Sequence, residues 1–267
     1  MRADEALVLS GICESVERAR ALIMEGRALY GSDRIAYPSQ TIKRPELLRL
    51  KGAKGEYVSR GAYKLKKAFE VFPISAEGKV CADIGSSTGG FTDIMLRYGA
   101  SKVYCVDVGY NLLDWKIRSD PRVVPMEKTN ARLLRPEMFD ERIQFGATDV
   151  SFISLKLVLP AVFGVLEKDA DFVALIKPQF EISRELVGEK GVVRDREAHI
   201  SVVEDLLSFL TQSGISVRDL SFSPIRGPEG NIEFLTLLKN DACGDAVSRE
   251  KILETVEKAH AALEADA

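Results

Sequence analysis

Four charged side chains lie at the ends of expected strands or in otherwise apolar segments. Lys177 follows the apolar run VALI and precedes Pro178, which stops a strand from continuing. Asp149 ends the segment FGATD, while Lys64 and Glu233 lie in SRGAYKLKKAF and GNIEFLTLL. Taken singly, each is more simply a surface charge or a cap, since a lysine can extend its amine into solvent. Taken together, two amines and two carboxylates could share one site of zero net charge.

A lysine amine in such a site could take a proton from a weakly acidic hydroxyl. A second cation and partial burial both favour the neutral, basic form of an amine. We expect Lys177 to act as this base or to orient the hydroxyl, and Lys64 to supply the positive field that steadies an alkoxide. Asp149 and Glu233 would orient the two amines through hydrogen bonds. This chemistry requires no metal, and no metal-ligand spacing is visible in the sequence.

A glycine-rich loop between an expected strand and helix predicts a cofactor site. VCADIGSSTGGFTD, residues 80–93, allows the backbone to approach a ligand closely where the helix begins. Asp107 ends the next strand, where a carboxylate can hold both hydroxyls of an adenosine ribose. The cofactor residues that we predict are Asp83, Gly85, Ser87, Gly89, Gly90, Phe91, Asp107 and Asn130.

Asp83 separates two adenosine cofactors that would otherwise both fit this loop. A dinucleotide would place its pyrophosphate beside Asp83, which would repel it. S-adenosylmethionine carries no phosphate, and its ammonium and sulfonium groups are attracted by a carboxylate. The sequence therefore favours S-adenosylmethionine over NAD and, with Lys177, methyl transfer to a hydroxyl. Because the sulfonium is already activated, positioning of the attack would supply much of the remaining rate.

Alternating strands and helices from about residue 58 to 239 predict a doubly wound α/β sheet of Rossmann-like type. Asp149 and Lys177 would then follow neighbouring parallel strands, 143–148 and 171–176. Strands 216–223 and 232–238 have no helix between them, so the last strand should be antiparallel. His199 and His260 fall on expected helices and are interpreted as surface residues. The other expected elements are helices 60–71, 90–98, 112–117, 154–165 and 196–213 and strands 80–84, 102–107 and 122–125.

The domain organisation follows from the same pattern. Residues 1–50 form a small α/β module with a first helix ended by Gly11, a second capped by Ser15, and strands near 28–30 and 35–37. Residues 51–58 are a linker rich in glycine and lysine. The methyltransferase domain spans 59–240, and an amphipathic helical tail spans 241–267. The module carries a local basic excess, with 11 Lys/Arg against 8 Asp/Glu in residues 1–60, in a chain of net charge −3.

Composition and hydropathy restrict the class of protein. The 267 residues have the apolar and charged fractions of a soluble globular protein, and no apolar stretch is long enough to span a bilayer. Arg2, Asp4 and Glu5 make the N-terminus too charged for a signal peptide. Cys81 and Cys105 lie in strand-like runs and should be buried free thiols; Cys13 and Cys243 complete no metal motif. We therefore expect a cytoplasmic protein.

The chain contains SRGAYKL, ADIGSSTGGFTD, DVSFISL, IKPQFE, GVVRD and GNIEFL. In order and spacing these segments resemble the TlyA (haemolysin A) family of FtsJ-like RNA 2′-O-methyltransferases, up to about Asn240. The resemblance implies ribosomal RNA or ribosomal subunits as the substrate and cytidine riboses as the acceptor. It also implies a Lys-Asp-Lys-Glu tetrad, whose positions match Lys64, Asp149, Lys177 and Glu233.

The segment RADEALVLSGICESVERARALIMEGRALY is similar to the RNA-binding module of ribosomal small-subunit protein S-four. It departs from that pattern at Val16, where an arginine is usual, and at YGSD, which replaces a Val-Asn-Gly turn. The candidates for phosphate contacts are Arg2, Arg18, Arg20 and Arg27.

Two readings of another class compete with an rRNA methyltransferase. A membrane-lysing haemolysin is disfavoured because the sequence has no spanning segment and no strongly basic amphipathic helix. An RNA-binding assembly factor with an inactive methyltransferase domain is disfavoured by the intact glycine loop and the complete set of four charged residues. The oligomeric state is left open.

Overall fold

The computed structural model describes residues 1–267 except 11, 14, 25, 32, 44, 46–47, 51–56, 184, 186, 189–190, 228–229, 242–246 and 265–267. The predicted helix end at Gly11, most of the predicted linker 51–58 and Cys243 lie outside the described residues. The chain divides into two compact units, Met1–Glu56 and Tyr57–Ala267.

The first unit packs two short helices against a small sheet. Its helices are α1 (Ala3–Leu9) and α2 (Val16–Met24), and its strands are β1 (Ala28–Tyr30), β2 (Asp33–Arg34) and β3 (Leu48–Leu50). The strand order is β2-β1-β3, with both pairs antiparallel. Ser15 Oγ accepts the backbone N–H of Arg18 at 3.2 Å and so caps α2, as predicted. The expected strand near 35–37 is wrong: the strand that pairs with β1 in this region is β2, which ends at Arg34, and the core residue Ile35 follows it.

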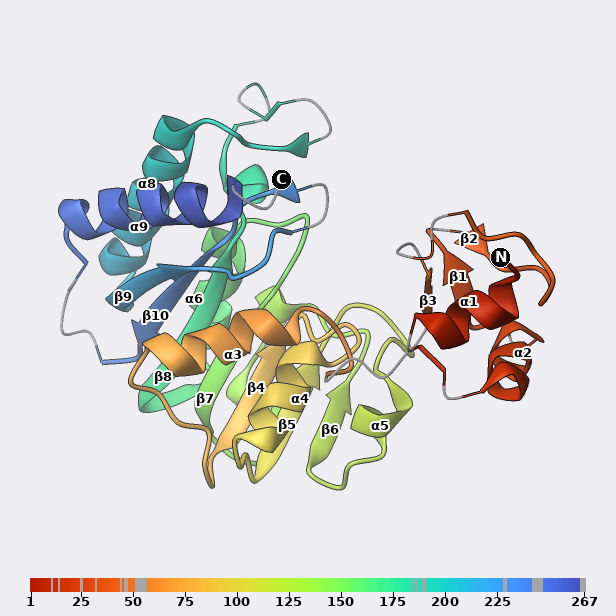
Figure 1. Ribbon diagram of the computed structural model, residues 1–267. Coiled ribbons are helices and arrows are strands. Elements are labelled where there is room, and N and C mark those ends of the chain that lie inside the picture. The colour runs from red at the N-terminus through yellow and green to blue at the C-terminus, as the bar shows by residue number, and fades with distance from the viewer. Residues whose placement is uncertain are drawn as a thin grey trace. The chain divides into compact units, whose positions relative to one another are not determined.

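The second unit is built on a mixed sheet of seven strands (Figure 1). The strand order is β6-β5-β4-β7-β8-β10-β9, parallel from β6 to β8 and antiparallel at β8–β10 and β10–β9. The predicted doubly wound α/β class with an antiparallel last strand is therefore confirmed. The strands are β4 (Val80–Ile84), β5 (Lys102–Val106), β6 (Val123–Met126), β7 (Ile143–Thr148), β8 (Leu166–Ile176), β9 (Ser216–Phe222) and β10 (Phe234–Lys239).

Helices cover both faces of this sheet, because its central strands are apolar on both sides. On one face, α3 and α4 pack with Cys81, Phe145 and Val173. On the other, α6, α8 and α9 pack with Ala82, Phe172 and Phe234. The helices are α3 (Ala62–Val71), α4 (Gly90–Arg97), α5 (Trp115–Arg118), α6 (Leu155–Phe163), α7 (Pro178–Glu181), α8 (Arg196–Gln212) and α9 (Arg249–Glu264), with 3-10 turns η2 (Ala131–Leu133) and η3 (Pro136–Met138).

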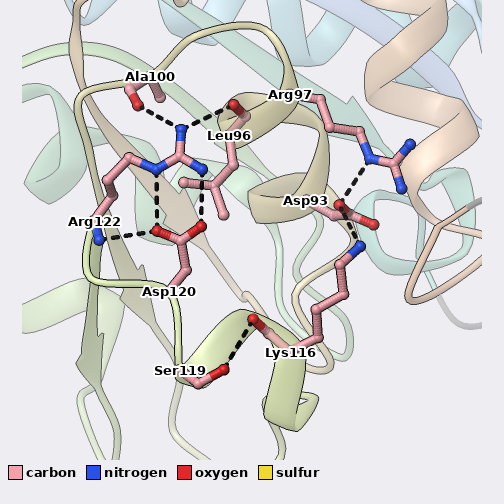
Figure 2. A network of polar contacts seen from close by, with 8 residues as sticks. All are labelled: Asp93, Leu96, Arg97, Ala100, Lys116, Ser119, Asp120 and Arg122. Atoms are coloured by element: carbon pink, nitrogen blue, oxygen red, sulfur yellow. Dashed lines mark hydrogen bonds and ion pairs between the residues drawn. The ribbon is translucent and has the colours of Figure 1, made fainter.

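Polar contacts fix both ends of α4, the helix that follows the glycine-rich loop (Figure 2). Near its start, the almost fully buried carboxylate of Asp93 accepts from the backbone N–H of Val58 at 3.0 Å and from Arg97 Nε at 2.9 Å. Near its end, Arg122 donates to the carbonyls of Leu96 and Ala100 while its guanidinium pairs with Asp120. Arg122 thereby adds side-chain hydrogen bonds to the last turn of α4 and to the segment that follows it.

The predicted surface position of His199 and His260 is wrong. Both side chains are buried, and Nδ1 of His199 lies 2.9 Å from Nε2 of His260. The contact joins α8 to α9, which run side by side (Figure 1). Each imidazole satisfies a polar atom of the other, which makes burial tolerable. The helical periodicity of each segment does not predict this pairing, because His199 and His260 lie on different helices, 61 residues apart.

Candidate active site

The carboxyl ends of the parallel strands bring the predicted residues to one edge of the sheet. Asp149 directly follows β7 and Lys177 directly follows β8, and these two strands are parallel neighbours. Lys177 is also the residue before α7, whose Pro178 occupies the first helical position. Glu233 lies just ahead of β10 rather than inside it, and β10 pairs with β8. Lys64 comes from the first turn of α3.

The four side chains form one continuous chain of contacts. Lys177 Nζ lies 2.6 Å from Asp149 Oδ1, and Lys64 Nζ lies 3.2 Å from Asp149 Oδ2. Lys64 Nζ also lies 2.7 Å from Glu233 Oε2. Asp149 therefore bridges the two amines, and Lys64 bridges the two carboxylates. Both amines are almost fully buried, Glu233 is fully buried, and the Asp149 side chain keeps 19% of its surface exposed.

The two carboxylates differ in their tendency to ionise. Burial favours the neutral form of Asp149, but the charges and hydrogen bonds of Lys64 and Lys177 outweigh it and lower its pKa. Burial raises the pKa of Glu233, and the opposing charge of Lys64 offsets this only in part. The two amines therefore favour the ionised form of Asp149. Glu233 is harder to ionise, and the charge that favours its ionised form comes mainly from Lys64.

The glycine-rich loop has the backbone shape that the sequence predicts. Gly85 and Gly89 have φ angles of 82° and 92°, in the left-handed region that glycine adopts without strain. The carboxylate of Asp107 ties the loop to β5, since it accepts the backbone N–H groups of Ser87 at 2.8 Å and Gly109 at 2.7 Å. Each oxygen keeps further lone-pair capacity, so ribose hydroxyls could still donate to Asp107.

Asp83 lies beneath this loop and is almost fully buried. Its Oδ2 accepts from the backbone N–H of Thr92 at 2.9 Å and from Thr92 Oγ1 at 2.7 Å. Burial raises the pKa of Asp83 to about 7, and the bonds from Thr92 offset this in part. A cationic ligand next to Asp83 would lower that pKa again and would gain affinity from the charge.

Two cavities meet at the four-residue cluster. The first, of about 390 Å³, is lined by Asp107, Thr129, Asn130 and Val158. The second, of about 270 Å³, is lined by Arg60, Lys64, Asp83, Phe91 and Lys177. Gly85, Ser87, Asp149 and Ser151 line both cavities. The size of the first cavity and its ribose-directed carboxylate fit an adenosine, and Asp83 and the amines line the space beside it.

Most of the predicted cofactor residues surround these cavities. Gly85, Ser87, Asp107 and Asn130 line the first, and Asp83, Gly90 and Phe91 line the second. Gly89 lies in neither lining and serves the turn before α4. Asn130 also caps the η2 turn, because its side chain accepts the N–H of Arg132 at 3.1 Å.

The sequence analysis missed two residues of the segment DVSFISL. Ser151 Oγ accepts from Lys177 Nζ at 2.8 Å, so the lysine has two fixed partners. Phe152 is 90% exposed with a φ of 63°, and its ring lies 5.1 Å from that of Phe180. An exposed aromatic residue in a strained conformation next to a cavity is a signal for ligand contact. Ser151 could have been noticed because it lies two residues after Asp149.

The predicted phosphate-contacting arginines of the first unit have different surroundings. Arg2 and Arg20 both hold the fully buried Asp4, through Arg2 Nη2 at 2.9 Å and Arg20 Nε at 2.9 Å. Their hydrogen bonds lower the pKa of Asp4 strongly. Arg18 is exposed and makes no ion pair with a described residue, while Arg27 is half-buried.

Three further features of the described part of the chain concern its helices, its possible metal ligands and its cysteines. No described helix is long and apolar enough to cross a membrane. Among the described residues, no group of three or more His, Cys, Asp or Glu side chains could hold a metal ion. Cys81 and Cys105 are buried free thiols, as predicted.

Known proteins resemble this chain over most of its length. The FtsJ-like methyltransferase family matches residues 57–240. YqxC of Bacillus subtilis, provisionally named an rRNA methyltransferase, is 46% identical over 98% of this chain and 95% of its own length. The 16S/23S rRNA (cytidine-2′-O)-methyltransferase TlyA of Mycobacterium tuberculosis is 38% identical over 97% of this chain and 96% of its own.

A solved structure agrees over the full length of the chain. It comes from Streptococcus thermophilus, is provisionally named a hemolysin, and superimposes with a TM-score of 0.79 at 43% identity. The superposition covers 100% of this chain and 98% of that one. The family match and the glycine-loop cavity together confirm the predicted enzyme class and its cofactor, S-adenosylmethionine. This chain belongs to the FtsJ-like methyltransferase family.

Proposed function

We propose that this protein transfers a methyl group from S-adenosylmethionine to a ribose 2′-hydroxyl of ribosomal RNA, at a cytidine. The observation that carries the proposal is the unbroken contact chain Lys177–Asp149–Lys64–Glu233 where the two cavities meet. The likeness to TlyA, which is named for cytidine 2′-O-methylation of 16S and 23S rRNA, supports the choice of substrate.

In this proposal the second cavity receives the ribose, and Lys177 acts on its hydroxyl. Lys177 Nζ lies 2.6 Å from Asp149 Oδ1 and 2.8 Å from Ser151 Oγ. These two contacts leave one position on the nitrogen for the substrate hydroxyl. S-adenosylmethionine, when bound, supplies a methyl group on a sulfonium that departs as a neutral thioether. Lys177 takes the hydroxyl proton as the oxygen–methyl bond forms, and the charge of Lys64 stabilises the developing alkoxide.

Glu233 positions Lys64, and Asp149 positions both amines. Loss of Glu233 would leave Lys64 held by Asp149 alone, and loss of Asp149 would remove the one carboxylate that contacts both amines. An inactive RNA-binding factor would have no need for such a cluster beside a cofactor cavity. The first unit would recruit RNA through its arginines, as an S-four-type module does.

Lysine variants test the role of the amine directly. Lys177→Met should lower methyl transfer to ribosomal particles by at least about 100-fold, the lower range of a general base. Affinity for S-adenosylmethionine should change far less than turnover, because the adenosine part of the cofactor occupies the first cavity, which Lys177 does not line. Lys177→Arg keeps the charge but cannot accept a proton, so it should be equally inactive. Incorporation of labelled methyl groups and calorimetric titration of the cofactor measure these effects.

Lys156→Met is the matched control. Lys156 of α6 pairs with the exposed Asp205 of α8, away from the four-residue cluster, and should be dispensable for methyl transfer. Wild-type turnover in Lys177→Met would rule out a catalytic amine. Activity in Lys177→Arg alone would assign Lys177 to orienting the hydroxyl rather than to removing its proton.

A further inference from the structure

The C-terminal helix α9 lies beyond the segment that the methyltransferase family matches, yet it contacts the loop beside Glu233. The guanidinium of Arg226 donates to the carbonyl of Leu263, with Nε at 3.1 Å and a second bond from Nη2. Leu263 is in the last turn of α9, where carbonyls lack helical partners and the helix dipole favours a cation. Arg226 therefore fastens the loop between β9 and β10 to the end of α9.

The backbone of Arg226 contacts a residue that lines the second cavity. The carbonyl of Arg226 accepts from Nη2 of Arg60 at 3.3 Å, and Arg60 lines that cavity. The side chain of Arg226 thus contacts α9 while its main chain holds a residue of the cavity wall. Displacement of Arg226 would release Arg60 as well.

The neighbouring residue, Gly227, packs directly on Glu233. A Cβ atom at position 227 would lie only 2.3 Å from Glu233 Oε1, so no larger residue fits without moving the carboxylate. Oε1 is buried and has no hydrogen-bond partner among the described residues, whereas Oε2 lies 2.7 Å from Lys64. With no hydrogen bond to Oε1, the position of this carboxylate depends on the fit against Gly227 and on Lys64.

Hydrogen bonds hold the described residues of the loop near these two contacts. Gly227 N–H donates to the carbonyl of Asn231 at 2.9 Å, and Ser223 N–H donates to that of Glu233 at 2.9 Å. The buried Asn231 side chain accepts the N–H of Val193 at 3.0 Å and donates to the carbonyl of Gly191 at 3.0 Å. A shift at Arg226 would therefore reach Glu233 rather than be absorbed within the loop.

We propose that Arg226 is a positioning residue for methyl transfer: it uses the end of α9 as a fixed support that keeps Gly227 against Glu233 and Arg60 at the second cavity. This inference rests on the proposed function only in its choice of assay. It predicts that α9 contributes to catalysis without touching substrate or cofactor. Neither Arg226 nor Arg60 lines the first cavity, where the adenosine part of the cofactor fits, so cofactor affinity should change little in Arg226 variants.

Full-length variants test the proposal. Arg226→Met should lower kcat for RNA methylation about tenfold and raise KM for RNA, while the Kd for S-adenosylmethionine changes less than twofold. Arg226→Lys retains a cation at the helix end and should recover at least half of the lost rate. Gly227→Ala should reproduce the kcat defect, because its Cβ displaces Glu233. Arg196→Met is the control: it removes the exposed α8–α9 pair with Glu257 and should leave kcat unchanged.

Hydrogen exchange gives a readout that does not depend on activity. In Arg226→Met, amides of residues 223–234 should exchange faster than in wild type, whereas those of α4 should not. Unchanged exchange in that segment would overturn the proposal even if no RNA substrate were methylated. If wild type were active, equal kcat in Arg226→Met and Arg196→Met would also overturn it. Inactive wild type with accelerated loop exchange would instead reject the proposed function and leave the support by α9 established.

Discussion

Lys64 contacts carboxylates from two different strand ends, and this arrangement decides the charge of the whole site. Without Lys64, Asp149 and Glu233 would repel each other, and Asp149 would be left with Lys177 as its only described ion-pair partner. Asp83 lies under the glycine-rich loop as a third acidic group, and its pKa of about 7 places its titration near neutrality.

Cofactor affinity should depend on the ionisation of Asp83. Above pH 7 its carboxylate attracts the cationic methyl donor, and below pH 7 the protonated acid does not. From pH 7.5 to 6 the Kd for S-adenosylmethionine should rise about tenfold, following the ionised fraction. The folded chain binds this proton more tightly than the unfolded chain, so the contribution of Asp83 to stability falls as pH rises from about 4 to 7.

Calorimetric titration across this pH range measures the effect on the cofactor. Asp83→Asn should bind weakly at every pH in the range, with a flat profile. An equally steep profile in Asp83→Asn would assign the pH dependence to another group.

At the scale of elements, α8 and α9 share a buried pair of imidazoles. Burial, together with the neighbouring His260, lowers the pKa of His199 to about 4. The folded chain therefore binds fewer protons at this site than the unfolded chain between pH 6.5 and 4. By linkage, stability should fall as the pH falls through this window.

The free energy of unfolding should drop by about 2 kcal/mol from pH 7 to 5 because of His199. Urea unfolding at the two pH values measures this drop. In the double variant His199→Leu, His260→Leu, most of this drop in the free energy of unfolding should disappear. The part of the pH dependence that comes from other titratable groups should remain. A dependence as steep as that of wild type would show that the histidine pair does not couple pH to the packing of α9.

The sequence predicted local features of these elements better than contacts between them. Apolar runs and glycines located every strand of the second unit, and Asp149 and Lys177 could be paired because parallel strands end at one edge. Lys64 lies on a helix and Glu233 just ahead of the last strand, far apart in sequence. Their charge and apolar surroundings grouped them with Asp149 and Lys177, and the family resemblance matched all four to one tetrad. Ser151 and the histidine pair were missed because their partners come from other elements.

At the scale of the whole molecule, the chain combines a small unit with its own core and a methyltransferase unit. The small unit is proposed to bind RNA, and its arginines are not equivalent. Arg2 and Arg20 both hold buried Asp4, so their loss would disturb the fold as well as any phosphate contact. Arg18 is exposed and can be removed with less structural effect.

Arg18→Ser should weaken RNA binding at low salt and reduce the slope of log K against log salt by about one. Its Kd for S-adenosylmethionine should equal that of wild type. Binding to ribosomal RNA at several salt concentrations measures the slope. Arg249→Ser, in the other unit, is a control of equal charge change. If Arg18→Ser, Arg249→Ser and wild type all had the same slope, Arg18 would not contact the RNA phosphates.

The central claim is that the transferred methyl group ends on a ribose oxygen. Ribosomal particles that lack the modification, incubated with the protein and S-adenosylmethionine, should yield 2′-O-methylcytidine when their RNA is digested to nucleosides and analysed by mass spectrometry. The same nucleoside should be absent with Lys177→Met and present with Lys156→Met. A methyl group found on a base, or no methylated nucleoside with wild type, would contradict the account.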